Sequence, residues 1–211
     1  MNNNNTKILL GAVKKWEKPE GKIIIGIDGY GEAGKTTLLK GVNEGNILIV
    51  NRDDFAIPRK DLAAKYKSAR SDDEKVDIMV NKTINTKELI SFLKQYKNSN
   101  EIIEWKIRDD ITGLKNKTKK FDFSKRIMII EGILLYGHNS LSNLIDRKVF
   151  VDIDQTEADK RRMTREKEKW GKDYFPDTHP DSYFRFIKIG FNDYLKNQNP
   201  KERADLVIES T

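Results

Sequence analysis

Cysteine is absent from the 211 residues of the sequence. Its absence excludes a disulfide framework, thiolate nucleophiles and cysteine-ligated zinc or iron–sulfur sites, and it fits a reducing, cytoplasmic location. Histidine is scarce: the two present, His138 and His179, lack the spacing of a transition-metal site. No apolar run approaches the ~20 residues that a membrane-spanning helix needs, so we expect neither export nor membrane insertion.

Acidic residues are outnumbered by basic ones, 33 against 40, which leaves a formal net charge of +7. This balance favours anionic partners, but it does not distinguish nucleic acid from small phosphorylated ligands. The strongest basic run is interpreted as a solvated hairpin edge rather than a nucleic-acid surface. It consists of Lys115, Lys117, Lys119, Lys120, Lys125 and Arg126. A chain of this length predicts one domain with one hydrophobic core.

Short, continuous apolar runs recur along the chain and predict the strands of a sheet. They lie at residues 23–27, 47–50, 127–130, 149–153 and 206–208. Continuous apolarity is typical of parallel strands that helices cover on both faces. The predicted fold class is therefore α/β, with a parallel five-stranded sheet flanked by helices. Residues 1–6 are expected to be a disordered tip, and residues 7–16 a short helix.

Residues 57–126 form a long segment between the second and third runs, and we interpret it as an insertion on the substrate side. Ser71 and Glu74 match a capping box at the start of a helix. A later helix has one apolar face, formed by Leu89, Phe92, Leu93 and Tyr96. The rest of the segment predicts a small hairpin packed on the sheet edge. The core of the predicted single domain is then about residues 22–56 and 127–211.

A glycine-rich segment follows the first apolar run and fits the pattern G-x-x-x-x-G-K-[ST]. Its glycines let the backbone curl so that N–H groups point at phosphate oxygens. Lys35 is placed to reach the β- and γ-phosphates, and the Thr36 hydroxyl to bind a bridging Mg²⁺. This predicts a P-loop NTPase fold that binds magnesium with a nucleoside triphosphate, ATP or GTP. The predicted nucleotide-binding residues are Gly29, Gly31, Glu32, Ala33, Gly34, Lys35, Thr36 and Thr37.

Two acidic residues follow separate predicted strands, at the edge of the sheet where open α/β proteins bind ligands. Asp53 comes after residues 47–50 and is a candidate to accept the proton of an attacking alcohol, a role worth ~10²–10⁴ in rate. The alternative is that it caps a helix. Glu131 ends the third run and is a candidate to hold Mg²⁺, directly or through water.

Arg162 and Arg165 lie three positions apart, on one face of a predicted helix. There, two guanidinium groups can clamp a transferring phosphoryl group. The alternative is a solvated charged helix, because Glu166 and Glu168 interleave the basic residues. Residues 166–180 have the glycine and prolines of a mobile lid, which would close over the triphosphate and keep water out.

Taken in order, these motifs resemble the uridine kinase family of P-loop kinases, which is related to nicotinamide riboside kinases and phosphoribulokinase. The resemblance covers roughly residues 22–56 and 127–209. Its clearest parts are Gly26-Ile27-Asp28-Gly29 through Thr37, Asp53-Asp54-Phe55, Glu131-Gly132-Ile133-Leu134 and residues 150–173. It implies that Asp53 is the catalytic base and that Thr36 and Glu131 lie beside magnesium. It also implies that Arg162 and Arg165 are lid arginines.

Two departures concern the substrate. Trp170-Gly171-Lys172 stands where uridine kinases usually show Arg-Gly-Arg, and Ala56 stands where the family often has Tyr, so uridine specificity is not implied. The expected activity is transfer of the γ-phosphate of ATP to a hydroxyl of a small molecule, a nucleoside or ribose derivative. A P-loop NTPase switch or regulator without a small acceptor, a nucleic-acid end kinase and a catalytically degraded nucleotide-binding protein stay open as alternatives. The sequence sets no oligomeric state.

Overall fold

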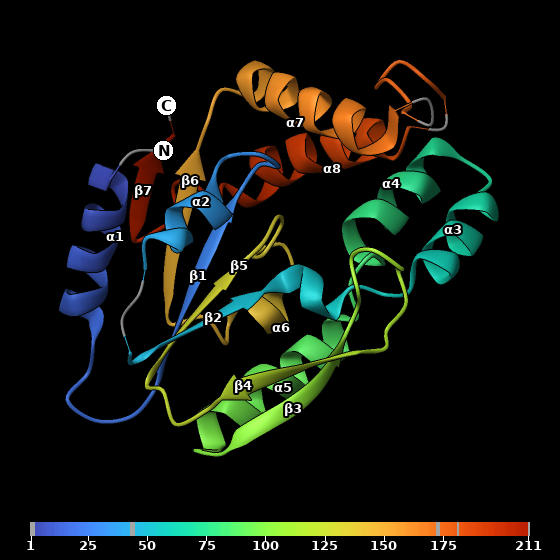
Figure 1. The fold of residues 1–211 in the computed structure, drawn as a ribbon. Helices are drawn as coiled ribbons and strands as arrows, with labels where there is room; N and C mark the ends of the chain where they lie inside the picture. The colour runs from blue at the N-terminus through green and yellow to red at the C-terminus, as the bar shows by residue number, and fades with distance from the viewer. Residues whose placement is uncertain (1–2, 43–44, 172–173, 181, 211) are drawn as a thin grey trace.

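The computed structural model describes residues 3–42, 45–171, 174–180 and 182–210. Its central feature is a sheet of five parallel strands in the order β2-β5-β1-β6-β7 (Figure 1). The strands are β1 (Ile23–Gly29), β2 (Ile47–Asn51), β5 (Ile127–Glu131), β6 (Arg147–Asp152) and β7 (Leu206–Glu209). The predicted parallel five-stranded sheet is confirmed, and only the strand ends shift by one or two residues.

Strand register brings the candidate site residues to one edge of the sheet. Ile27 of β1 and Asn51 of β2 both pair with Glu131 of β5, so the carboxyl ends of these three strands lie side by side. Because parallel strands all run in one direction, the loops that follow them emerge at the same edge. The glycine-rich segment, Asp53 and Glu131 are neighbours for this reason.

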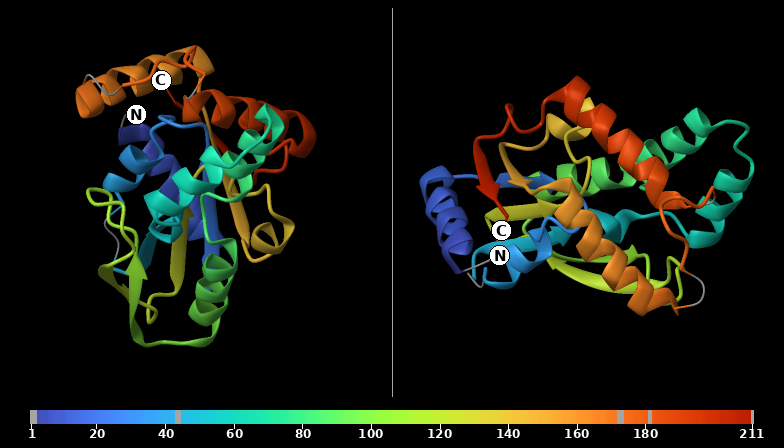
Figure 2. Two further views of the ribbon diagram at one scale, coloured as in Figure 1. Left: turned by 90° about the vertical axis from the view of Figure 1, so that its right-hand side faces the viewer. Right: turned by 90° about the horizontal axis from the view of Figure 1, so that it is seen from above.

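Helices cover both faces of the sheet. Leu9 of α1 (Asn3–Trp16) and Leu38 of α2 (Lys35–Lys40) pack with Ile25 on one face. On the other face, α5 (Thr86–Asn98), α6 (Asn139–Ser142) and α8 (Tyr183–Gln198) pack with Ile24. Figure 2 shows α2 and α8 on opposite sides of the sheet. Successive strand residues point to opposite faces, so a continuous apolar run serves both cores.

The first helix begins earlier than the sequence predicts. The expectation of a disordered tip is wrong for its last residues, because α1 starts at Asn3. The Asn5 side chain donates to the Glu209 carbonyl at 3.0 Å, and the Thr6 hydroxyl donates to the Leu38 carbonyl at 3.2 Å. These two contacts, with β7 and α2, hold the first turn in place. The polar composition of this turn gives no sign of them.

The segment between β2 and β5 contains helices and a hairpin, as predicted. It begins with a short 3-10 helix, η1 (Arg52–Phe55), and continues with α3 (Arg59–Lys67), α4 (Asp72–Asn81) and α5. One half of the capping box is confirmed, because the Ser71 hydroxyl accepts from the Glu74 N–H at 3.1 Å. The Glu74 carboxylate accepts from the Arg70 N–H at 2.7 Å, one residue before the N-cap. The hairpin of β3 (Ile102–Ile107) and β4 (Lys117–Asp122) is a separate antiparallel sheet. It packs on α5, where the ring centroids of Phe92 and Phe121 are 4.8 Å apart.

The long helix α7 (Gln155–Trp170) follows β6 and runs beside α8 above the carboxyl edge of the sheet (Figure 1). Of the predicted lid, residues 172 and 173 lie outside the described residues. Among the helices that the structure describes, none combines the length and the apolarity that crossing a membrane requires.

Candidate active site

The phosphate loop, residues 29–36, leads from β1 into α2 and needs glycine at two positions. Gly29 has a φ of +152°, and a Cβ there would lie 2.4 Å from the carbonyl oxygen of Val151. Gly34 is left-handed, with a φ of 86°, and caps α2. Between them Glu32 also has a positive φ, 60°. The loop therefore curls tightly, and this curl is what turns successive backbone N–H groups toward a bound anion.

The other predicted loop residues occupy three different environments. Ala33 is fully buried on the sheet face that α1 and α2 cover, and Gly31 is half-buried, with Phe184 of α8 as its neighbour. Thr36 and Thr37 are exposed in the first turn of α2. The loop is thus anchored on one side by packing and open on the side where a nucleotide would bind.

Lys35 is buried at the start of α2, with 9% of its surface exposed. Its Nζ donates to the carbonyl oxygens of Gly29 and Tyr30, both at 2.8 Å. Burial lowers the pKa of its ammonium group, and the carboxylates of Asp28 and Glu131 oppose that shift. The ammonium group therefore lies inside the curl of the loop and is held there by weak acceptors, which phosphate oxygens can replace.

Thr36 and Glu131 come from different elements and are in direct contact. The Thr36 hydroxyl donates to Oε1 of Glu131 at 2.8 Å, and the Asn51 amide lies 3.4 Å from the same oxygen. Burial raises the pKa of Glu131, against the hydrogen bond from Thr36 and the charge of Lys35. A hydroxyl beside a carboxylate suits Mg²⁺, which prefers oxygen ligands.

This pair is not a complete metal site by itself. No cluster of three or more His, Asp or Glu side chains with metal-binding geometry occurs in the described ranges. Mg²⁺ usually keeps several waters and takes substrate phosphates as ligands together with one or two protein groups. The donor set of Thr36 and Glu131 fits that mode of binding.

Asp53 is the second residue of η1, directly after β2, and its carboxylate is open to solvent; 60% of the side chain is exposed. Its backbone N–H donates to Oδ1 of Asn51 at 2.8 Å, so Asn51 is the N-cap of η1. Asn51, and not Asp53, is therefore the residue that caps this helix. The nearest cation to Asp53 is Arg52, whose Nη1 lies 3.9 Å from Oδ1. The Asp53 carboxylate is free to meet a ligand at the carboxyl edge of the sheet.

The two predicted lid arginines differ in their surroundings. Arg162 is almost fully buried, with 1% of its surface exposed, and its guanidinium carbon lies 3.5 Å from the centre of the Phe184 ring. Three carboxylates surround it: Asp159 at 3.9 Å, Glu166 at 3.2 Å, and Asp177. Arg165 is more than half exposed and pairs with Glu32 of the phosphate loop. The structure therefore brings Arg165 to the loop and Arg162 into the contact between α7 and α8.

Two buried charges beside the loop are missing from the site that the sequence predicts. Asp28 accepts hydrogen bonds from the Gly29 N–H at 2.7 Å and from the Tyr194 hydroxyl at 2.6 Å, and burial raises its pKa. An acid that ends an apolar strand directly before the glycine pattern is a signal that could have found it. Arg52 is 7% exposed, and no pattern in the sequence around it indicates that it is buried.

Comparisons with known proteins agree with this geometry. The family model described as Phosphoribulokinase / Uridine kinase family matches residues 24–211. A uridine kinase of Chlamydia pneumoniae is 31% identical over 189 residues, which cover 88% of this chain and 81% of that protein.

Solved structures share the fold. The structure of a possible uridine kinase from Bacillus stearothermophilus matches with a TM-score of 0.67 and 18% identity over 97% of each chain. A D-glycerate 3-kinase from Cryptococcus neoformans var. grubii matches with a TM-score of 0.59 and 12% identity, over 98% of this chain and 93% of that one. The chain therefore belongs to the phosphoribulokinase and uridine kinase family, and it is a phosphotransferase with an alcohol group as acceptor.

Proposed function

We propose that this protein transfers the γ-phosphate of ATP to a hydroxyl group of a nucleoside or another ribose derivative. The observation that carries the proposal is the meeting of groups from three strands at one edge of the sheet. Lys35 and Thr36 follow β1, Asp53 follows β2, and Glu131 ends β5. The uridine kinase relative supports a nucleoside as acceptor, since 31% identity extends over most of both chains.

In this mechanism the protein binds the triphosphate, orients the acceptor hydroxyl toward the γ-phosphate and removes the proton of that hydroxyl. The loop N–H groups and Lys35 bind the phosphates, and the Asp53 carboxylate accepts the proton of the acceptor hydroxyl. The acceptor oxygen forms a bond to the γ-phosphorus while the bond from that phosphorus to the bridging oxygen breaks, so ADP leaves with the bridging oxygen. Magnesium bound by Thr36 and Glu131 would supply positive charge to the phosphate oxygens.

Arg165 is the better supported of the two lid arginines. Its partner Glu32 lies in the phosphate loop, so a triphosphate bound there would compete with Glu32 for the guanidinium group. Arg162 would have to leave Asp159, Glu166 and Asp177 to reach the same place. We therefore assign phosphate contact to Arg165 and attachment of α7 to α8 to Arg162.

The acceptor side of the site is assigned to residues 57–126 in a single domain whose core is residues 22–56 and 127–211. This segment is joined to the turn that carries Asp53. The Arg108 N–H donates to the Asp54 carbonyl at 3.3 Å, and Lys119 pairs with the Asp54 carboxylate at 2.7 Å. The hairpin therefore stands beside η1, where its loop can contact an acceptor.

An acceptor screen tests the proposal. ADP production is measured with Mg-ATP and, in turn, nucleosides, nicotinamide riboside, pantothenate and ribose phosphates. We expect one class that contains ribose to raise ADP production well above the basal rate. Asp53→Asn should then lower transfer ~10²-fold or more while ATP affinity stays nearly intact. Lys35→Ala should weaken both binding and transfer.

Asp54→Asn is the paired comparison at the next residue. The Asp54 carboxylate is bound to Lys119 of the hairpin, so this variant should raise the KM for the acceptor more than it lowers kcat. Unchanged turnover in Asp53→Asn would reject the base assignment. Steady ATP hydrolysis that no acceptor accelerates would favour an NTPase without a small acceptor.

A further inference from the structure

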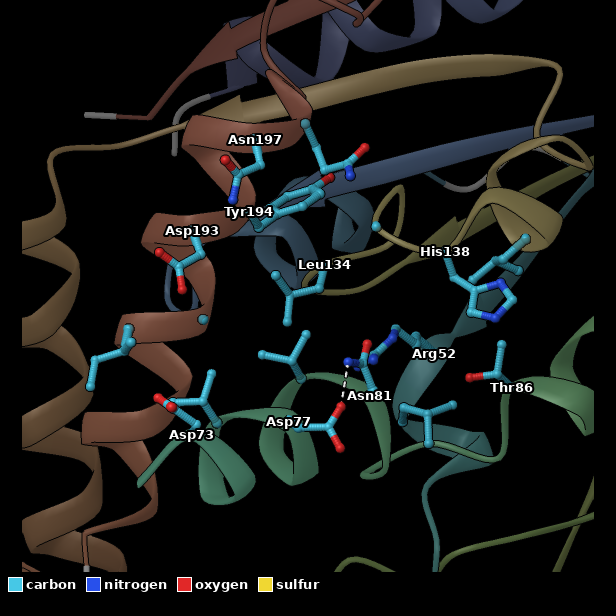
Figure 3. A pocket seen from close by; sticks show the side chains of 18 residues that line it. Arg52, Asp73, Asp77, Asn81, Thr86, Leu134, His138, Asp193, Tyr194 and Asn197 are labelled. Atoms are coloured by element: carbon cyan, nitrogen blue, oxygen red, sulfur yellow. Dashed lines mark hydrogen bonds between the residues drawn. The ribbon is translucent and has the colours of Figure 1, made fainter. Parts of the chain in front are cut away.

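A cavity of about 440 Å³ lies between α4, α8, η1 and the connection from β5 to α6 (Figure 3). It is separate from the phosphate site, since none of Lys35, Thr36, Asp53 and Glu131 lines it. Apolar side chains form much of its wall, including Val80. Its size lies within the range of 300–1,000 Å³ that is typical of small-molecule sites.

Arg52 supplies a buried positive charge at one end of the cavity. Figure 3 shows its side chain reaching from η1 into the cavity, toward Asn81 of α4. The side chain is 9% exposed and makes no hydrogen bond among the described residues; its one ion pair, with Asp53, is 3.9 Å long. Burial lowers the pKa of this guanidinium group. The guanidinium group is thus poorly solvated and weakly paired, so an anionic ligand group in the cavity would give it a close partner.

The fold makes room for this arginine. A Cβ on Gly132, in the connection after β5, would lie 2.7 Å from Cβ and 2.6 Å from Cδ of Arg52. These atoms belong to the stem of the side chain, so they cannot simply swing away. Glycine at this position therefore allows Arg52 to cross the end of β5 and enter the cavity.

Negative charge stands at the other end of the cavity. Asp73 of α4 and Asp193 of α8 are exposed, lie on the side away from Arg52 in Figure 3, and form no ion pair within the described part of the chain. Asp77, between them and Arg52, is already engaged by Lys82 and by the Asn81 amide. The cavity thus has at its buried end a cation whose one ion pair is long, at its mouth two carboxylates without an ion pair among the described residues, and apolar walls between them.

We propose that this cavity is a second ligand site, which binds a small zwitterion. The anionic group of the ligand pairs with Arg52, its protonated amine faces Asp73 and Asp193, and its apolar middle lies against Val80. A ligand with only negative charge meets the two carboxylates at the mouth, and a simple amine leaves Arg52 without a partner. Both are therefore poorer ligands than a zwitterion.

A ligand in the cavity would also affect phosphoryl transfer at the phosphate site. Arg52 is the cation nearest to Asp53, so an anionic group that draws the guanidinium into the cavity weakens its contact with that carboxylate. The rate of phosphoryl transfer should then change when the cavity is filled. This coupling rests on the proposed function, whereas the binding does not.

The test uses the full chain without nucleotide and a series of linear ω-amino acids of increasing length. Each is compared with the carboxylic acid and the amine of the same length, by calorimetry. We expect at least one ω-amino acid to bind about tenfold more tightly than either matched compound, which corresponds to about 1.4 kcal/mol. Arg52→Gln should lower that affinity about tenfold or more, and Asp193→Asn should lower it less.

Arg161→Gln is the matched control, because Arg161 pairs with Glu157 on α7, outside the cavity. Asp193→Asn changes an exposed residue and keeps the test valid if Arg52→Gln fails to fold. The proposal is overturned if no ω-amino acid binds, if the acid or the amine alone binds as tightly, or if both cavity variants keep full affinity. Competition between the ω-amino acid and ATP would also overturn it, because the ligand would then occupy the phosphate site.

Discussion

At the scale of single residues, the carboxylate of Asp28 joins three elements behind the phosphate loop. Its Oδ1 accepts from the Gly29 N–H, while its Oδ2 accepts from the Leu135 N–H at 2.8 Å and the Tyr194 hydroxyl at 2.6 Å. The end of β1, the connection after β5 and α8 are thereby tied together. Buried carboxylates need such donors, because an unpaired one would be strongly destabilising. The loop is thus preorganised from behind by a group that would not contact the nucleotide.

Glu131 makes stability depend on pH. Burial raises its pKa above the ordinary value, so the folded protein binds this proton more tightly than the unfolded chain does. The stability that it contributes therefore falls as the pH rises from the unfolded pKa through the folded pKa, and it is lowest at neutral pH. Glu131→Gln removes the buried charge and keeps an oxygen acceptor for Thr36. We expect this variant to have the higher free energy of unfolding at neutral pH, with the gain shrinking in acid.

Urea titrations at a series of pH values measure this difference. Glu104→Gln is the control, because Glu104 is 61% exposed on the hairpin, so its replacement removes no buried charge and should bring no comparable gain at neutral pH. A Glu131→Gln variant no more stable than the parent at neutral pH would refute the assignment of burial as the dominant effect. The same variant should bind Mg-ATP more weakly, since one oxygen donor has lost its charge.

Gly29 is required by space as well as by conformation. Gly29→Ala would place a methyl group 2.4 Å from the Val151 carbonyl oxygen, in a backbone conformation that L-residues rarely adopt. We expect it to lower the free energy of unfolding by about 2 kcal/mol or more. Gly31→Ala, two positions on, meets nothing closer than the Phe184 ring at 3.5 Å and should change stability by less than about 1 kcal/mol. Chemical denaturation of both variants checks the contrast; equal losses would contradict it.

At the scale of elements, α4 and α8 pack together at a glycine. A Cβ on Gly190 would lie 2.1 Å from a methyl carbon of Val80 and 3.3 Å from one of Val76. The two helices can approach this closely only because α8 has no side chain at that position. This contact holds α4 against the body of the protein and forms one wall of the cavity described above.

Gly190→Ala should push the helices apart and destabilise the protein by about 1–3 kcal/mol, the usual cost of overpacking. Val80→Ala removes the opposing methyl groups, so the double variant should recover part of that loss, and a double-mutant cycle measures the coupling. Gly11→Ala in α1 is the control, because open space surrounds that position. It should be neutral or stabilising by up to about 1 kcal/mol, since alanine favours helix. If the effects of Gly190→Ala and Val80→Ala simply add, the contact between these two positions does not limit how closely α4 and α8 pack.

The sequence predicts these elements unevenly, for physical reasons. Strands are predictable because burial on both faces requires a continuous apolar run. The phosphate loop is predictable because its backbone conformation requires glycine at fixed positions. The burial of Arg162 is not predictable, since its partners Asp177 and Phe184 lie on other parts of the chain. The same holds for Arg52, whose place in a cavity depends on Gly132 and on α4. A local sequence pattern shows where the backbone needs glycine and which face of an element is apolar. It does not show which charged side chains from distant parts of the chain will be in contact.

At the scale of the whole molecule, two apolar layers enclose the sheet, and α1 closes one of them. Leu9 and Val13 of α1 are buried in the cluster that also contains Leu38 and Leu39 of α2. The residues of α1 that face inward recur at intervals of four, as Asn5, Leu9 and Val13, so one narrow side of this helix makes the contact. Because α2 carries Lys35 and Thr36, the helix at the beginning of the chain supports the phosphate loop from behind.

Leu9→Ala tests this role. The side chain is fully buried, so its truncation should lower the free energy of unfolding by about 2–4 kcal/mol through lost transfer energy and a residual cavity. Ile8→Ala, one position earlier and 43% exposed, is the control and should cost less than about 1 kcal/mol. Saturating Mg-ATP should raise the Tm of the Leu9→Ala variant, because a ligand present at 100 times its Kd raises the free energy of unfolding by about 2.7 kcal/mol. Equal losses in the two variants would show that α1 does not close this layer. A Tm that Mg-ATP fails to raise would show that the Leu9→Ala variant no longer binds the nucleotide.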